Sequence, residues 1–421
     1  NHQEKNSAFF YLGYSYYKMN KNDLAKNSFY ELITSFDNPY KEDAIFYNSC
    51  ILLRENNKIL ALSGFENLKE SKKYSKEVPY FISKILFDLN RYENISNYLE
   101  SVLDSNNCTN YNNLVLLYAK ALYHLKKYDL AVVYFEEYKS LSDTLTREQL
   151  YQIGIAYYQK GLYGFAINHL NKIILEDDSI AQYAFYYLGD SYIHTNNRPE
   201  AMNAFRSASL LGQDSLIQHD SFYHFALLCY EQNNPLYNPI DYLSDFIEQY
   251  PNSEHADEVY TCLANIYLNS HNYDQAINVL EKSNFLDENI KHQYQKIAFY
   301  KAVQLYNDEN YQQAIRYFDK SINVTGDNKL LYESYYWKAE AYYNLGMFHE
   351  SLLSYQRLNK NTELYLQSLY AQGYCYLKTK DFNNSIKKFK SAIKHTTDKK
   401  ILHDSYVRIG DNYFLLMNYT L

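Results

Sequence analysis

The chain has 421 residues and a formal net charge of −8, from 41 basic and 49 acidic residues. This acidic balance argues against a general nucleic-acid binder, which usually needs a basic face. Eleven glycines and six prolines are too few for a doubly wound α/β fold or a many-turned β protein. Tyrosine occurs 51 times and tryptophan once, so tyrosine must supply part of the core volume.

A usually small residue followed four positions later by a large apolar residue recurs along the whole chain, at intervals of 34 to 38 residues. Self-similarity at a nearly fixed period is typical of repeat architectures. In chain order, the eleven pairs are Ala25/Phe29, Ala61/Phe65, Ile95/Leu99, Ala131/Phe135, Ala166/Leu170, Ala201/Phe205, Pro239/Leu243, Ala276/Leu280, Ala314/Phe318, Ser351/Tyr355 and Ser385/Phe389.

A second signature lies about thirteen residues before each pair. It is a hydrophobic–small step followed three positions later by an aromatic residue or leucine, as in Leu12-Gly13 with Tyr16. Apolar residues at i, i+3, i+4 and i+7 in both segments predict two amphipathic helices per unit. Short polar turns separate the two, and their Asn and Asp residues can cap the second helix. The sequence therefore predicts an all-α chain of eleven helical hairpins, with Tyr406–Tyr419 beginning a twelfth.

Three of the prolines mark boundaries in this pattern. Pro39 and Pro251 follow second helices and stop them, and Pro199 lies in the first turn of a second helix, where its missing N–H costs nothing. Pro79 is the exception, because it falls where the first helix of the third unit is expected.

This pattern resembles the tetratricopeptide repeat, a helical hairpin of about 34 residues with small residues at its eighth and twentieth positions. The resemblance covers essentially the whole chain. It implies a right-handed superhelical solenoid of about 11–12 hairpins that runs as a single continuous domain over residues 1–421. We expect the chain to be a fragment of a longer protein, with a truncated twelfth repeat at 402–421.

The stretch Tyr250–Glu258 resembles a narrower group, because it is similar to the inter-repeat turn of tetratricopeptide proteins of the bacterial cell envelope. Those proteins include the lipoprotein of outer-membrane assembly and the coordinator of peptidoglycan synthesis. The likeness favours a bacterial protein in the periplasm or at the outer membrane, with the cytoplasm as the alternative.

Motifs that carry chemistry are missing from the sequence. It contains no GxxxxGK[ST], GxGxxG or HExxH, and its five cysteines form no CxxC pair. We therefore predict no catalytic residue, no cofactor and no metal, and do not expect an enzyme.

The resemblance also implies which residues face the concave groove of the solenoid: positions 2, 5, 9, 12 and 13 of each first helix. These positions carry many aromatic residues, beside acidic ones such as Asp190 and Glu340. Tyrosine suits a peptide-binding groove because it offers contact area and a hydrogen-bonding tip. The alternative is that these residues only pack neighbouring repeats. The predicted groove residues are Phe10, Tyr14, Tyr17, Tyr151, Tyr158, Tyr183, Tyr186, Phe299, Tyr306, Tyr336, Tyr343, Tyr370 and Tyr374.

A second group of tyrosines occupies the packing position of first helices and is expected in the core. It consists of Tyr16, Tyr157, Tyr192 and Tyr413. Chaperone-binding members of the family hold a partner's terminal carboxylate with Lys and Asn at positions 5 and 9. No unit of this chain has that pair, so this binding mode is not expected.

These observations favour a non-catalytic scaffold that binds a protein or peptide in an aromatic groove of a bacterial envelope assembly. One alternative is a peptide-sensing module that regulates an output domain outside this chain. Another is a glycan-binding helical-repeat protein, although the only tryptophan, Trp337, is expected in the core. Nucleic acid and a membrane span are not expected, whereas self-association through the solenoid ends is.

Overall fold

The computed structural model describes residues 2–36, 38–104, 108–142, 144–232, 235–283, 287–324, 326–360 and 362–417. Over these ranges the chain forms 23 α-helices and no β-strand. It falls into two compact units, Asn1–Phe225 and Ala226–Leu421. The predicted all-α fold, a solenoid of stacked helical hairpins, is confirmed in both.

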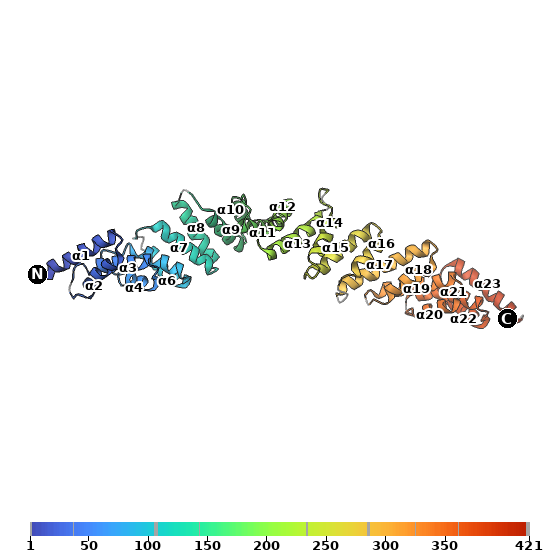
Figure 1. Ribbon diagram of the computed structural model, residues 1–421. Coiled ribbons are helices and arrows are strands. Elements are labelled where there is room, and N and C mark those ends of the chain that lie inside the picture. The colour runs from blue at the N-terminus through green and yellow to red at the C-terminus, as the bar shows by residue number, and fades with distance from the viewer. Residues whose placement is uncertain are drawn as a thin grey trace. The chain divides into compact units, whose positions relative to one another are not determined.

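The N-terminal unit consists of six hairpins followed by the beginning of a seventh (Figure 1). Its helices are α1 (His2–Lys18), α2 (Asn22–Thr34), α3 (Lys41–Arg54), α4 (Lys58–Glu66), α5 (Val78–Asp88), α6 (Tyr92–Asp104), α7 (Tyr111–His124), α8 (Tyr128–Leu141), α9 (Arg147–Gln159), α10 (Tyr163–Leu170), α11 (Ser179–His194), α12 (Arg198–Leu211) and the first part of α13 (Ser215–Gln232). Pro79 lies in the first turn of α5, so it begins this helix and does not interrupt it.

The C-terminal unit contains the rest of α13 and ten further helices, of which the last has no second helix after it among the described residues. These helices are α14 (Pro239–Gln249), α15 (Ala256–Asn269), α16 (Tyr273–Leu280), α17 (Glu288–Asn307), α18 (Tyr311–Ile322), α19 (Asn328–Asn344), α20 (Phe348–Tyr355), α21 (Glu363–Lys378), α22 (Phe382–His395) and α23 (Lys399–Leu415).

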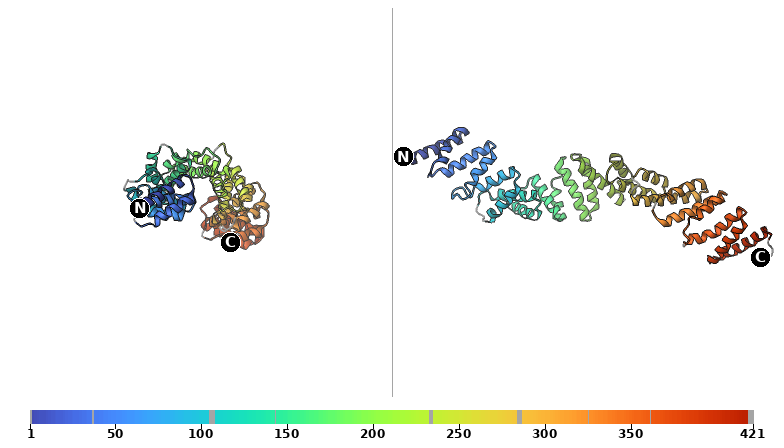
Figure 2. Two further views of the ribbon diagram at one scale, coloured as in Figure 1. Left: turned by 60° about the vertical axis from the view of Figure 1, so that its left-hand side comes forward. Right: turned by 90° about the horizontal axis from the view of Figure 1, so that it is seen from below.

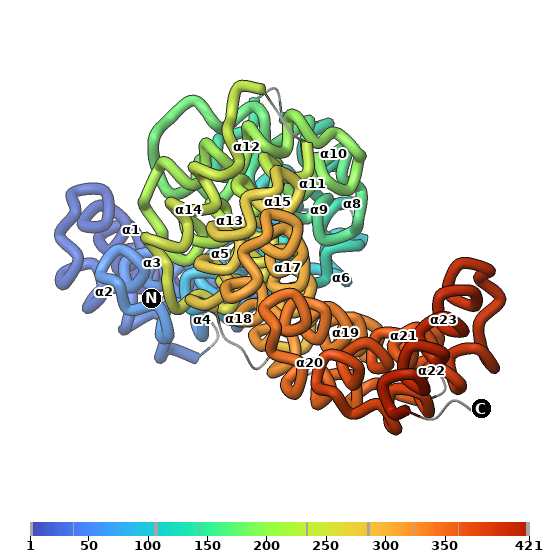
Figure 3. The backbone as a smooth tube through the Cα atoms, turned by 90° about the vertical axis from the view of Figure 1, so that its right-hand side faces the viewer, coloured from blue at the N-terminus to red at the C-terminus, as the bar shows by residue number. Residues whose placement is uncertain are grey.

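Hairpins that are neighbours in sequence are neighbours in space within each unit, as the gradual change of colour shows (Figure 2). The first helices of successive hairpins also touch one another, as α7 touches α9 and α19 touches α21. In the C-terminal unit, α19, α21 and α23 follow one another on one side, with α20 and α22 on the other (Figures 1 and 3). The first helices therefore form a surface of their own.

The core follows the repeat that the sequence shows. Each of the eleven small–large pairs falls in an even-numbered helix, from α2 to α22. The large residue of every pair is at most 1% exposed, from Phe29 to Phe389. Because each hairpin buries the same position, the hydrophobic period in the sequence becomes a succession of core clusters along each unit.

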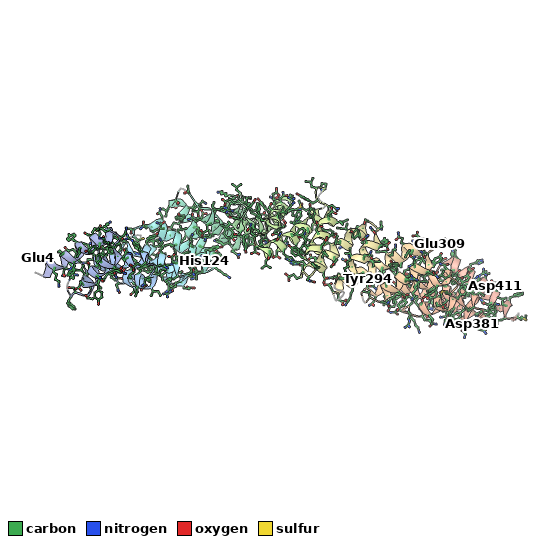
Figure 4. All side chains as sticks on the ribbon, in the orientation of Figure 1. Glu4, His124, Tyr294, Glu309, Asp381 and Asp411 are labelled. Carbon is green, nitrogen blue, oxygen red and sulfur yellow. The ribbon has the colours of Figure 1, made fainter. Side chains whose placement is uncertain are left out.

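The turn inside ten of the eleven hairpins contains one residue with a left-handed backbone, which ends the first helix and lets the second begin; part of the turn between α13 and α14 lies outside the described residues. Asparagine adopts this conformation more readily than most residues with a Cβ, which accounts for part of the asparagine in these turns. Figure 4 labels Glu309 and Asp381, which lie in two of the turns. The left-handed residues are Asn20, Asn56, Asn90, Lys126, Gly161, Asn196, His271, Glu309, Gly346 and Lys380.

Glycines in the first helices allow the second helix to approach closely. A Cβ added to Gly189 would lie 2.8 Å from the ring of Phe205, and one added to Gly373 would lie 2.8 Å from the ring of Phe389. Atoms do not approach so closely without displacing a neighbour. The close helix approach predicted from the periodic glycines is thereby confirmed at these hairpins.

We expect Gly373→Ala to destabilise the C-terminal unit by about 1–2 kcal/mol, because overpacking against Phe389 outweighs the better helix propensity of alanine. Gly410→Ala is the matched control: Gly410 lies at the corresponding position of α23, and an added Cβ would meet nothing within 4 Å. That variant should gain about 0.5–1 kcal/mol. Urea unfolding of the full chain, followed by circular dichroism, checks both signs. Equal effects of the two substitutions would contradict the close approach.

Buried glutamines join successive hairpins in both units. The Gln182 carboxamide, fully buried, accepts a hydrogen bond from the Asp214 backbone N–H (2.6 Å) and donates to the Asp214 carbonyl (3.1 Å). Gln295 holds the backbone of Asp327 in the same way, at 2.6 and 3.1 Å. In each case the carboxamide satisfies the backbone of the loop that leads into the next first helix, 32 residues later.

Candidate functional site: a tyrosine-rich surface on the first helices

Twelve of the thirteen predicted groove residues are half-buried on the first helices. Phe299 differs, because it is only 7% exposed and packs against Phe318, with the ring centroids 6.1 Å apart. The prediction that Phe299 lines an open groove is therefore wrong. Because its side chain has no polar atom, it can be buried without a hydrogen-bond partner, and it packs in the core between α17 and α18.

The predicted residues at the N-terminus form a cluster of stacked rings. Phe10 stacks on Tyr40 (4.8 Å) and on Tyr14 (6.0 Å). Tyr17 accepts a hydrogen bond from the Arg54 guanidinium (2.8 Å), which also lies 4.2 Å from the centre of its ring. These rings bind one hairpin to the next, as the packing alternative predicts for them.

Tyrosines of the fifth and sixth hairpins also use their hydroxyls between hairpins. Tyr158 donates to the Asp190 carboxylate (2.7 Å), and Tyr183 donates to that of Asp214. The hydrogen bond to Asp214, together with burial, raises the pKa of the Tyr183 phenol above its ordinary value. The side chain of Tyr151 is half-buried, and burial raises the pKa of its phenol.

Two further predicted residues pack in a similar way. Tyr186 meets the ring of Phe205 at 6.0 Å in an edge-on arrangement. Tyr306 accepts a hydrogen bond from Asn344 (3.0 Å) and meets Trp337 at 5.3 Å. Trp337, which the sequence placed in the core, is half-buried and packs against the buried residues of α17 and α18.

The tyrosines expected in the core fall into two groups in the structure. Tyr157 is buried, but Tyr16, Tyr192 and Tyr413 are only half-buried, so the core assignment of these three is wrong. Their rings pack against the core while two of the hydroxyls reach polar partners: Tyr192 accepts from Asn171 (3.0 Å) and Tyr413 accepts from Lys390 (2.8 Å). The hydroxyl of a partly buried tyrosine usually lies near water or a hydrogen-bond partner while the ring packs against apolar residues.

Four other predicted residues come together at a pocket in the C-terminal unit. The pocket has a volume of about 420 Å³ and opens between α19, α21 and α23, all first helices. The lining tyrosines come from α19 and α21, in successive repeats, so only the stacking of hairpins brings them together. The pocket is lined by Tyr336, Glu340, Tyr343, Gln367, Tyr370, Ala371, Tyr374 and Ile401.

Glu340 brings a carboxylate into this aromatic pocket. It accepts hydrogen bonds from the hydroxyl of Tyr355, which is fully buried in α20, and from that of Tyr336. Burial raises the pKa of Glu340 above its ordinary value, although the two hydrogen bonds act in the opposite direction. Within the described part of the chain, the ionised carboxylate is thus held by two phenols and by no positively charged group.

A second carboxylate orients two of the lining rings. Asp404, on α23, accepts hydrogen bonds from the hydroxyls of Tyr370 (2.7 Å) and Tyr374. Burial would raise the pKa of Asp404, but hydrogen bonds from Tyr374, Tyr370 and Arg408 outweigh it and hold that pKa below its usual range. The positions of both rings are therefore tied to the next hairpin.

Gln367 lies where the pocket meets two neighbouring hollows. One, of about 290 Å³, is lined by residues of α21 such as Glu363, by the end of α22 with His395, and by the turn before α23 with Asp398. The other, of about 340 Å³, lies beside Lys329 and Glu333 of α19 and also includes Glu363. Since Gln367 lines all three, they form one surface, which we call the Gln367 surface. It carries the carboxylates of Glu333, Glu340, Glu363 and Asp398, with Lys329 and His395 as its basic groups.

Sequence reasoning missed Gln367, Ala371 and Ile401, which have no distinctive motif. Tyr355 did leave a signal. It is the only residue with a hydroxyl among the eleven large residues of the repeat, and a buried hydroxyl needs a partner. Glu340, fifteen residues earlier, is that partner.

Other classes of site find no support in the described part of the chain. Within it, no group of three or more His, Cys, Asp and Glu side chains is placed to hold a metal ion. Cys50, Cys108, Cys262 and Cys375 are free thiols. Over the same residues, no helix combines the length and the hydrophobicity needed to cross a membrane.

Parts of the chain match a known protein family. The family model described as the tetratricopeptide repeat matches residues 7–39, 183–208 and 333–361. The chain contains tetratricopeptide repeats. The third segment includes most of α19, with Tyr336, Glu340 and Tyr343, and all of α20, with Tyr355. This confirms the resemblance on which the repeat positions were assigned.

A tetratricopeptide relative is the TPR repeat-containing protein MJ1428 of Methanocaldococcus jannaschii, 26% identical over 326 residues. The match covers 73% of this chain, and the chain spans about half (52%) of that relative. Two similar solved structures are YrrB, described as a TPR protein with an unusual peptide-binding site, and a tetratricopeptide repeat protein from Parabacteroides merdae. YrrB is 19% identical, with 45% of this chain and 94% of YrrB covered and a TM-score of 0.38. The P. merdae protein is 16% identical, with 63% and 98% covered and a TM-score of 0.31.

Proposed function

We propose that this tetratricopeptide protein is a non-catalytic scaffold that binds a peptide segment of a protein partner on the Gln367 surface. The observation that carries the proposal is the junction of three hollows at Gln367, on the first helices of consecutive repeats. Together they offer aromatic rings, carboxylates and a carboxamide, which suit side chains and backbone of an unfolded segment.

The tyrosines support this assignment because most of their hydroxyls are already bound. Tyr370 and Tyr374 donate to Asp404, so ordering these rings costs little when a partner binds. Gln367 is exposed, and its carboxamide can donate to and accept from a peptide backbone. An assembly of the bacterial cell envelope remains the proposed setting, on the likeness of Tyr250–Glu258 to envelope repeat turns.

Selection of random dodecapeptides displayed on phage, with the full chain as bait, tests the proposal. We expect Gln367→Trp to weaken the binding of selected peptides about tenfold or more, because the indole would fill the junction of the hollows. The control is Gln356→Trp, the same change at an exposed residue after α20. Selected peptides that bind Gln367→Trp as tightly as the wild type would refute the site.

A further inference from the structure

The pocket around Glu340 has an unusual combination of chemistry. A carboxylate lies among the rings of Tyr336, Tyr343, Tyr370 and Tyr374, and among the described residues only phenol hydroxyls donate hydrogen bonds to it. A carboxylate in such surroundings loses much of its hydration without gaining a charged partner. A bound cation would restore the missing electrostatic interaction.

The rings favour the same kind of ligand. The face of a tyrosine ring attracts a cation that lies within about 6 Å of its centre, more strongly when water is excluded. Two of the four rings are held in place by Asp404. The remaining lining residues are Gln367, Ala371 and Ile401, so no basic side chain lines the pocket.

Arg408, a basic residue of α23 that contacts Asp404, is already engaged. The Arg408 guanidinium pairs with Asp404 (3.3 Å) and with Asp411 (2.6 Å), and it does not line the pocket. The adjoining hollows add the carboxylates of Glu333, Glu363 and Asp398, against Lys329 and His395 as their basic groups, so carboxylates are in the majority. An anionic ligand would meet repulsion here, and a neutral ligand would leave Glu340 without a charged partner.

We propose that the Glu340 pocket binds the ammonium or guanidinium end of a lysine or arginine side chain of the bound peptide. The proposal rests on the proposed function, because it names the side chain by which a peptide on the Gln367 surface is recognised. The carboxylate pairs with the cation, the tyrosine rings surround it, and the aliphatic stem lies along Ala371 and Ile401.

The test uses peptides selected on the full chain and measures their affinity by isothermal titration calorimetry. We expect these peptides to share a lysine or arginine, and its replacement by norleucine to weaken binding about tenfold or more. With Glu340→Gln, the parent and the norleucine peptide should bind equally weakly. Glu309→Gln, the same charge change at an exposed turn residue, should leave the difference intact.

Substitutions of Tyr343 distinguish the contribution of its ring to binding from that of its hydroxyl. Tyr343→Phe should bind the lysine or arginine peptide within about twofold of the wild type, whereas Tyr343→Leu should lose about fivefold or more. Free n-butylammonium should compete only at far higher concentrations than the peptide. If it competes equally well, the ammonium alone is the ligand and a peptide side chain is refuted.

Failures of the two proposals are distinguishable. Peptides that bind at the Gln367 surface but need no basic residue, or whose norleucine loss persists in Glu340→Gln, would overturn the cation pocket and leave peptide binding in place. If no peptide is selected, peptide binding itself fails and the cation pocket fails with it.

Discussion

Truncation of Phe389 to alanine is expected to destabilise the C-terminal unit by about 3–5 kcal/mol. Phe389 is fully buried in α22, and its ring meets those of Tyr370 (5.9 Å) and Tyr374 (5.3 Å) edge-on. The close approach at Gly373 leaves the neighbouring backbone little freedom to fill the cavity. The loss should therefore include both the transfer and the cavity contribution.

Hydrogen exchange of the full chain measures this effect locally, because opening in a repeat protein need not involve every repeat. Amides of α21 and α22 should exchange about a hundredfold faster or more in Phe389→Ala. Phe414→Ala is the control, since Phe414 on α23 is 66% exposed and its truncation should change stability by about 0.5 kcal/mol at most. Similar exchange in the two variants would show that Phe389 is not the core residue described.

Removal of the Tyr355 hydroxyl is expected to cost about 1–3 kcal/mol at neutral pH. Tyr355→Phe keeps the buried ring but deprives the Glu340 carboxylate of a donor. Trp337 provides the signal for urea unfolding of the full chain, because it is the only tryptophan and lies on α19 three residues before Glu340.

The cost should depend on pH with a definite sign. Burial holds the folded-state pKa of Glu340 above the unfolded value, so its ionisation lowers stability as the pH rises through that folded pKa. Tyr355→Phe removes an interaction that lowers this pKa, so the penalty should be largest at neutral pH and smaller near pH 4. In a Glu340→Gln background the effect of Tyr355→Phe should no longer vary with pH. A pH-independent penalty in the wild-type background would contradict the Tyr355–Glu340 hydrogen bond.

Much of the fold could be read from the sequence because each hairpin makes its own contacts. The spacing between a helix's glycine and the large residue of the next helix, as with Gly373 and Phe389, lies within one repeat. Such contacts recur at nearly the same interval, so the period shows them without knowledge of the structure. The first-helix positions that the repeat pattern assigned to the groove include Tyr336, Glu340, Tyr343, Tyr370 and Tyr374, and these residues meet at the pocket.

The sequence could not say which tyrosines are available to a partner. That depends on contacts about 30 residues apart, such as those of Tyr158 with Asp190 and of Tyr374 with Asp404, and on the rotamer of each ring. Repeat lengths vary from 34 to 38 residues, so the same position does not meet the same neighbour in every hairpin.

By itself, then, the sequence determined the all-α repeat, its period and the buried large residue of each repeat pair, because burial of that residue within a hairpin follows a local period. Only the tertiary structure showed that Phe299 is enclosed, that Tyr355 supports Glu340, and that the hollows meet at Gln367. The first two features depend on which side chains meet inside one hairpin, and the third arises between hairpins. In both cases the packing of individual side chains, which the repeat period does not show, decides whether an aromatic residue is enclosed or open to a ligand.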